Sequence, residues 1–284
     1  MRRPKRWVGH MILPAARFIR GSGHPPHKNF SPRKLLNPRN AVSVTPTGSP
    51  SIALSKLTNF HRDVTGRFGL IPNFFVSTPD APEIVERLWD FAKSAYLDSP
   101  IPSLFKERLF VFLSRFCPVR YCLIRHCGFL VGHGHSSGDS SARPQTIDQV
   151  IKLLRVAPPW RRELEPIYKA LAQIKEPIDW PAPETEIEEA IFALSALTFV
   201  QASQSERARE ILRQALGGRR FEYLLALLAF IRTAHYWTAV HPGLEIEDDV
   251  RELMSEHKEL ASLILEDPDL GYRLEAQDSF APIR

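Results

Sequence analysis

The sequence predicts an all-α protein, and three observations carry that prediction. Apolar residues recur at helical spacing through most of the chain after residue 51, as in Ile187, Ile191, Leu194 and Leu197. Capping boxes, in which a Ser, Thr or Asp stands three residues before a Glu or Gln, mark several helix starts. The alternating apolar and polar pattern of β-strands does not occur. The chain is long enough to bury a substantial core.

The basic residues are concentrated at the N-terminal end. The first 62 residues contain twelve Lys or Arg and no acid, and the first carboxylate is Asp63. Removing those twelve from the 37 basic residues leaves 25, against 32 acidic residues, so the remainder has a net charge of −7. The overall charge of +5 therefore describes the N-terminal end, and we expect no nucleic-acid partner. Residues 1–50 are rich in Pro, Gly, Ser and Arg, which predicts a disordered basic extension.

The helical domain is expected over residues 51–245, and its first half contains an apolar turn and three helices. The turn spans residues 68–75 and contains Gly69 and Pro72. The helix over residues 104–116 is apolar on almost every side, which places it in the middle of a bundle. The N-caps expected for the three helices are, in order, Asp80 in a box with Glu83, Ser103, and Cys117 before Pro118.

The second half of the domain begins with an expected insertion over residues 133–184, which opens with a polar loop. A helix from Ser203 should end at Gly217, and residues 246–284 should form a C-terminal helix and tail, with the helix over 247–267. Two capping boxes are expected to open further helices: Thr146 with Gln149, and Thr185 with Glu188.

The residues that indicate chemistry lie on the two central helices. Cys122 and His126 are four residues apart on the helix expected over residues 118–132, so their side chains share one face. Glu107 falls on an apolar stripe of the preceding helix, where a carboxylate is costly unless it finds a partner. His126 would be such a partner. A buried Glu–His pair beside a thiol is the arrangement that produces a thiolate at neutral pH.

This spacing of Glu107, Cys122 and His126 resembles the signature of the AhpD-like (alkylhydroperoxidase / carboxymuconolactone decarboxylase) superfamily. The peroxidase members carry Glu, then Cys-x-x-Cys-x-x-x-His, and Tyr121 suits the position before the second Cys. The first Cys of the family would fall at Val119, so the sequence departs from the pattern there. The resemblance extends over about residues 52–245 and implies an AhpD-like helical bundle with residues 133–184 inserted.

The resemblance also implies a function. Cys122 would attack a hydroperoxide, His126 and Glu107 would relay protons, and Tyr121 and Cys117 could assist. With Val119 in place of the resolving cysteine, we expect a thiol-dependent antioxidant oxidoreductase that has one catalytic cysteine or is degenerate. Its expected partners are a hydroperoxide or another small-molecule substrate, an external thiol reductant and further copies of the chain. The alternative is a non-catalytic redox-sensing or regulatory module of a bacterial signalling system.

Simpler interpretations of the same residues stand beside these. Cys122 could be an inert buried thiol, and Glu107 could form a surface ion pair with Lys106 or Arg108. A zinc site built from the three cysteines and His126 fails on helical geometry, so we expect no metal and no cofactor. The same geometry separates Cys122 from Cys117 and Cys127, each five residues away, if all three lie on one helix.

The cellular compartment is expected from two further features. All three cysteines lie within residues 117–127, which favours a reducing, cytoplasmic compartment. The chain has no run of 18 apolar residues, so we expect no membrane association.

Overall fold

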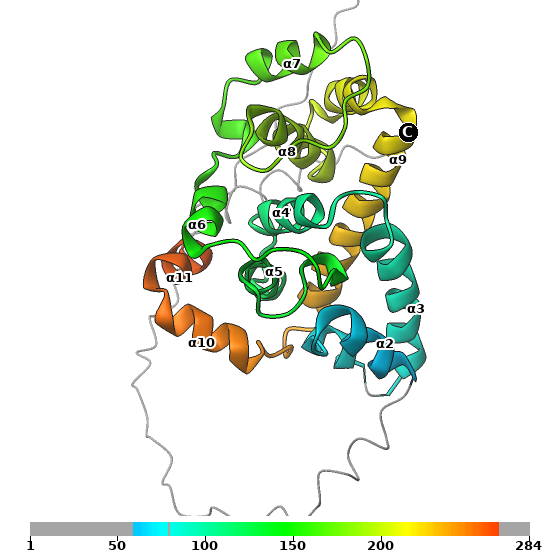
Figure 1. Ribbon diagram of the computed structural model, residues 1–284, viewed down its shortest axis with the longest axis vertical. Helices are drawn as coiled ribbons and strands as arrows, with labels where there is room; N and C mark the ends of the chain where they lie inside the picture. Colours follow the sequence, from blue (N-terminus) through cyan, green and yellow to red (C-terminus); the bar gives the residue numbers. More distant parts are fainter. Residues whose placement is uncertain (1–58, 79, 267–284) are drawn as a thin grey trace, which may run out of the picture. The chain divides into compact units, whose positions relative to one another are not determined.

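The computed structural model describes residues 59–78 and 80–266, and all regular secondary structure in these residues is helical (Figure 1). The expected basic extension over residues 1–50 lies outside the described residues, as does the end of the expected C-terminal tail. The all-α prediction is therefore confirmed for the described part of the chain.

The described helices have the following bounds: α2 Asn59–Phe68, η1 Asn73–Val76, α3 Pro82–Ala92, η2 Lys93–Leu97, α4 Ser103–Ser114, α5 Tyr121–Val131, η3 Ser136–Gly138, α6 Ile147–Arg155, η4 Pro159–Arg161, α7 Leu164–Ala172, α8 Glu186–Phe199, α9 Ser205–Val240, α10 Asp248–Glu256 and α11 Lys258–Leu265.

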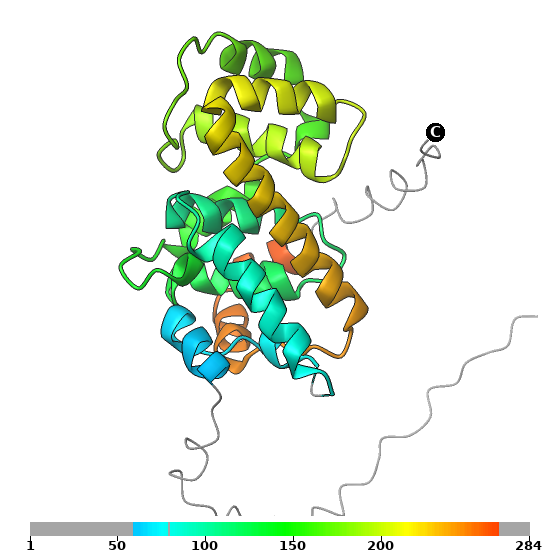
Figure 2. The ribbon, with the colours of Figure 1, turned by 90° about the vertical axis from the view of Figure 1, so that its right-hand side faces the viewer.

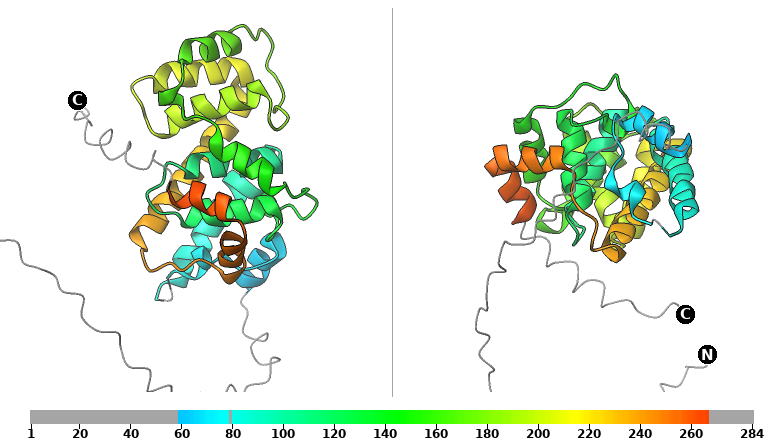
Figure 3. Two further views of the ribbon diagram at one scale, coloured as in Figure 1. Left: turned by 90° about the vertical axis from the view of Figure 1, so that its left-hand side faces the viewer. Right: turned by 90° about the horizontal axis from the view of Figure 1, so that it is seen from below.

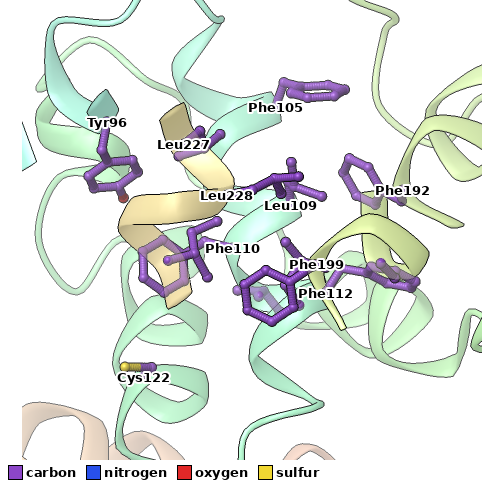
Figure 4. Close-up of a cluster of buried hydrophobic side chains, with 14 of the residues drawn as sticks. Tyr96, Phe105, Leu109, Phe110, Phe112, Cys122, Phe192, Phe199, Leu227 and Leu228 are labelled. Atoms are coloured by element: carbon purple, nitrogen blue, oxygen red, sulfur yellow. The ribbon is translucent and has the colours of Figure 1, made fainter. Parts of the chain in front are cut away.

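Helix α4 lies in the middle of the described fold, as its apolar sequence predicts. Every residue from 105 to 114 is buried, including the charged ones, because α4 packs against α5, α6, α8 and α9 (Figures 1 and 2). Helices α8 and α9 lie along each other, and α10 and α11 cover α5 and α6 (Figure 3). Rings from α4 and α8 interlock, with centroids of Phe105 and Phe192 5.3 Å apart at 70° (Figure 4).

Two of the expected helix starts have the predicted caps. Thr146 accepts a hydrogen bond from the Gln149 backbone at the start of α6, and the reciprocal bond of the capping box is also present. Thr185 accepts from the backbone of Glu188 at the start of α8, but the Glu188 carboxylate binds elsewhere. The Thr185 cap is thus confirmed, but the reciprocal bond from the Glu188 side chain to the Thr185 backbone is not formed, because that carboxylate accepts from Arg108 and from the Glu184 amide.

Three expected N-caps are wrong. Helix α3 begins at Pro82 after Ala81, because proline at the first position has no N–H to be capped and sets the helical φ. Asp80 therefore does not cap it. Ser103 is itself the first residue of α4, preceded by Pro102. Helix α5 begins at Tyr121, so Cys117 lies outside the helix in a non-helical segment, residues 117–120.

The C-terminal helices contain one break where the sequence predicts a helix end and one break that the sequence does not predict. Gly217, at φ 74° and ψ 156°, interrupts α9 at the expected helix end, and a second helical stretch continues to Val240. Helix α9 begins at Ser205, two residues after the expected start at Ser203. The single helix expected over residues 247–267 is two helices, because His257 adopts non-helical dihedral angles between α10 and α11.

Candidate functional site

Glu107 is fully buried on α4 and accepts hydrogen bonds from three side chains and one backbone amide. His126 Nδ1 lies 2.6 Å from Oε1. Oε2 accepts from the Tyr96 hydroxyl, from the Ser137 amide at 2.7 Å and from the Ser137 hydroxyl at 3.0 Å. A buried carboxylate needs such donors to offset the loss of hydration. The interpretation of Glu107 as a surface ion pair is therefore wrong.

Two of these donors were not identified from the sequence. Ser137 lies in the polar loop that begins the expected insertion, and its left-handed backbone (φ 51°) directs its amide at the carboxylate. A non-glycine residue in this conformation is uncommon and signals a local constraint. Tyr96 is buried in η2. Its burial raises the pKa of the phenol, so Tyr96 remains a donor to Glu107.

The ring of His126 is held on two sides. Its Nδ1 is bonded to Glu107, and the Phe110 ring stacks on it with centroids 3.5 Å apart at 17°. Among the described residues no group hydrogen-bonds to Nε2, and His126 retains 9% of its accessible surface. The Glu107 contact fixes the ring orientation and leaves Nε2 available for another proton acceptor or donor.

His126 and Cys122 line the same small cavity. Its volume of about 40 Å³ has room for about two or three water molecules. Figure 4 shows the Cys122 side chain near the Phe110 ring at one edge of the core. The walls are otherwise aromatic or apolar with one arginine: Phe68, Pro72, Phe74, Phe75, Tyr96, Phe110, Tyr121, Arg125, Phe129, Phe230 and Ala234.

The surroundings of Cys122 favour the neutral thiol over the thiolate. Only 2% of the residue is exposed, and its Sγ lies 3.9 Å from Thr238 Oγ1. Burial raises the pKa of the thiol, and the neighbouring Cys117 and Glu247 raise it further. The structure shows no hydrogen bond between the described side chains of Cys122 and His126. A proton must therefore leave Cys122 during the reaction if this thiol is a nucleophile.

Tyr121 connects segments that enclose the cavity. Its hydroxyl donates to Glu247 Oε1 at 2.5 Å and accepts from the Phe74 amide at 3.0 Å. Burial raises the pKa of the phenol. The ring thus joins the apolar turn near residue 74 to the start of α10, and Tyr121 also lines the cavity of Cys122.

The other cysteines differ in their surroundings. Cys117 is buried ahead of α5 and lines a second, larger cavity. Cys127 is fully buried on α5, and burial raises the pKa of its thiol. Val119, at the position of the family's first cysteine, is half-buried in the segment before α5.

Charged neighbours of Glu107 are buried but make their own contacts. Lys106 donates to the carbonyls of Leu97 at 3.0 Å and Ser99 at 3.4 Å, and burial lowers the pKa of its ammonium to about 8. Arg108 donates to both carboxylate oxygens of Glu188, at 2.7 and 2.8 Å. These contacts satisfy the two flanking charges, and the hydrogen bonds to Glu107 come from His126, Tyr96 and Ser137.

The described residues contain no group of three or more His, Cys, Asp or Glu side chains that could hold a metal ion. None of the described helices is long and apolar enough to cross a membrane.

Comparisons with known proteins give no match: no protein-family model, no curated protein and no solved structure is similar to the chain at a significant level. The resemblance to the AhpD-like superfamily therefore rests on the spacing of the sequence motif and remains a prediction.

Proposed function

We propose that the protein is an AhpD-like thiol-dependent peroxidase with a single catalytic cysteine. The observation that carries the proposal is the fully buried Glu107, bonded to Nδ1 of a histidine that shares a cavity with Cys122. A carboxylate that orients a histidine beside a thiol is the arrangement used to activate cysteine nucleophiles. The AhpD-like bundle, with residues 133–184 inserted, is the fold that accompanies this proposal.

The proposed reaction starts from the protonated thiol. A hydroperoxide enters the cavity, and Nε2 of His126 accepts the proton of Cys122. The sulfur then attacks the outer peroxide oxygen, the O–O bond breaks, and His126 returns the proton to the departing alkoxide. The products are an alcohol and Cys122 sulfenic acid, so the peroxide is reduced and the sulfur is oxidised. Glu107 stabilises the transient imidazolium through its 2.6 Å contact with Nδ1.

An external thiol completes the proposed cycle. Val119 stands where the family's resolving cysteine would be, so a reductant thiol condenses with the sulfenic acid and releases water. A second reductant thiol then attacks the mixed disulfide and regenerates Cys122. The oxidised product is the disulfide of the reductant.

A redox-sensing role is the second candidate, and the burial of Cys122 favours it. A thiol that is 2% exposed, with a raised pKa and a small cavity beside it, reacts slowly and is reduced slowly. Such a cysteine would record a single oxidation event and would pass the signal to a partner.

Peroxide consumption with added dithiothreitol distinguishes the two candidates. An enzyme consumes many equivalents of peroxide at a steady rate, whereas a sensor consumes about one and stops. Cys122→Ser should abolish the steady rate. Cys127→Ser is the matched control, because Cys127 is equally buried on the same helix and does not line the cavity. Absence of any Cys122-dependent consumption would overturn both candidates.

A further inference from the structure

A second cavity, of about 670 Å³, is formed where the end of α8 approaches the second half of α9. This volume is within the range of about 300–1,000 Å³ typical of small-molecule sites. The lining comes from the segment after α4, from η4 and the residues that follow it, from the end of α8 and from α9. It shares no lining residue with the cavity of Cys122.

The charged residues of this cavity are two arginines, Arg162 and Arg232, and no Asp or Glu lines it. Arg162 Nη2 donates to the Glu189 carboxylate at 3.3 Å and forms an ion pair with it. Its Nη1 is buried without a hydrogen-bond partner among the described residues. Arg232 donates to the Phe199 carbonyl and lies over the Phe199 ring. A buried guanidinium N–H left unbonded is costly, and a bound anion would satisfy it.

The start of α9 adds to the positive character of the cavity. Residues 201–204, immediately before α9 begins at Ser205, are part of the lining. The N-terminal end of a helix carries a partial positive charge from its aligned peptide dipoles. This charge and the two arginines both favour an anionic group.

The remaining walls are largely apolar and aromatic. Trp160, Leu197 and Phe199 supply apolar surface, and Tyr236, which also lines the cavity, is 70% exposed. A ligand with an apolar body would cover these walls, while its charged end met the arginines.

We propose that this cavity binds a small amphipathic carboxylate, whose headgroup is held by Arg162 and Arg232 and whose apolar body lies against Trp160 and Tyr236. Arginine suits a carboxylate because its planar fork donates two parallel hydrogen bonds. The inference is independent of the proposed peroxidase reaction, since no residue of the Cys122 cavity takes part in it.

Binding of decanoate to the full chain, measured by isothermal titration calorimetry without peroxide, tests the proposal. Decanoate should bind, and decan-1-ol, which lacks the charge, should bind at least tenfold more weakly. Arg162→Gln and Arg232→Gln should each weaken decanoate binding about tenfold or more, because each removes a charge-assisted contact. Arg213→Gln is the control, because Arg213 is an exposed arginine that lies on α9, as Arg232 does, but outside the cavity.

Tryptophan fluorescence provides a second readout that does not depend on the arginine variants folding. Decanoate should change the emission of the wild type, Trp160→Phe should lose that change, and Trp180→Phe, outside the cavity, should keep it. No decanoate binding, equal binding of decan-1-ol, or an unchanged affinity of folded Arg162→Gln would overturn the proposal. Tighter binding of decyl phosphate than of decanoate would overturn the assignment of a carboxylate.

Discussion

Oε1 of Glu107 lies 2.6 Å from Nδ1 of His126, and the carboxylate is completely shielded from solvent. The two residues are 19 positions apart in the sequence, and they lie on two different helices, α4 and α5. This contact fixes which ring nitrogen of His126 remains for chemistry. The proposed activity of Cys122 depends on this contact.

Glu107→Gln should lower the rate of peroxide consumption about 100-fold, the scale of a lost proton-transfer contribution. The amide cannot stabilise an imidazolium as a carboxylate does. The substitution should also lower the free energy of unfolding by about 1–3 kcal/mol, because the new amide NH₂ group faces a donor of His126 or Ser137 in a buried site. Stopped-flow peroxide assays and urea unfolding measure the two effects.

Glu188→Gln is the matched control for that variant. Glu188 is also a buried carboxylate, but it pairs with Arg108 and lies outside the cavity of Cys122. The Glu188→Gln variant should have a lower free energy of unfolding than the wild type but the same rate constant for Cys122 oxidation. An equal loss of rate in both variants would show that the effect of Glu107→Gln is only structural.

Lys106 should make stability depend on pH above neutrality. Burial lowers its pKa to about 8, from an ordinary 10.5 in the unfolded chain. Below pH 8 the ammonium is protonated in both states, whereas between about 8 and 10.5 only the unfolded chain holds the proton. Unfolding then takes up a proton, so this residue's contribution to the free energy of unfolding rises with pH across that interval.

Urea unfolding of the wild type and Lys106→Met at several pH values isolates this contribution. The stability of the wild type relative to Lys106→Met should increase from pH 8 to pH 10 and should be constant from pH 6 to pH 7. Both proteins contain the buried cysteines, whose raised pKa makes the free energy of unfolding fall as pH rises. Subtracting one protein's free energy of unfolding from the other's therefore cancels that contribution. A difference that is the same at pH 7 and pH 10 would mean that Lys106 is not desolvated.

Much of the site could be predicted from the sequence because its residues lie on regular helices. The i, i+4 spacing placed Cys122 and His126 on one face, and the apolar stripe around Glu107 indicated its burial. The structure brings Glu107 to His126 and lines one cavity with His126 and Cys122. The catalytic roles of these residues remain a prediction.

The parts that could not be predicted depend on non-helical backbone. Ser137 reaches Glu107 from a loop whose left-handed residue has no periodic signal. Cys117 looked like an N-cap because Pro118 commonly opens helices, yet α5 begins only at Tyr121. Burial of Cys122 raises its pKa, an effect of the surrounding aromatic packing that spacing along one helix does not reveal.

Cys117 lies outside α5, whereas Cys122 and Cys127 lie on it, so the two possible disulfides of Cys122 differ in geometry. Cys122 and Cys127 are five residues apart on α5, about 7.5 Å along the axis and 140° around it, too far for a disulfide. Cys117 lies off the helix, so this geometric exclusion does not apply to it. In the structure both cysteines are free thiols, and we expect Cys117 and Cys122 to remain unpaired.

Mass spectrometry after mild peroxide checks this expectation. With glutathione present, Cys122 should become glutathionylated before Cys127 is modified. Without glutathione, the sulfenic acid of Cys122 should persist long enough to be trapped. Rapid formation of an internal Cys117–Cys122 disulfide would contradict the expectation and would indicate a two-cysteine mechanism with altered spacing.

The basic N-terminal residues should be dispensable for folding. Residues 1–48 lie outside the described residues, and their sequence has no helical periodicity and no apolar face to bury. Deleting them should leave the helical circular dichroism per molecule and the Tm nearly unchanged. A large fall in either would mean that this segment packs against the helical domain.

The rate at which peroxide oxidises Cys122, followed by dimedone trapping and mass spectrometry, tests the central claim most directly. The wild type should be trapped at Cys122 first, and His126→Gln should slow this trapping about 100-fold by removing the proton acceptor at Nε2. Trapping at Cys127 should be slow and equal in both proteins. Equal rates at Cys122 in wild type and His126→Gln would contradict the claim that His126 activates this thiol.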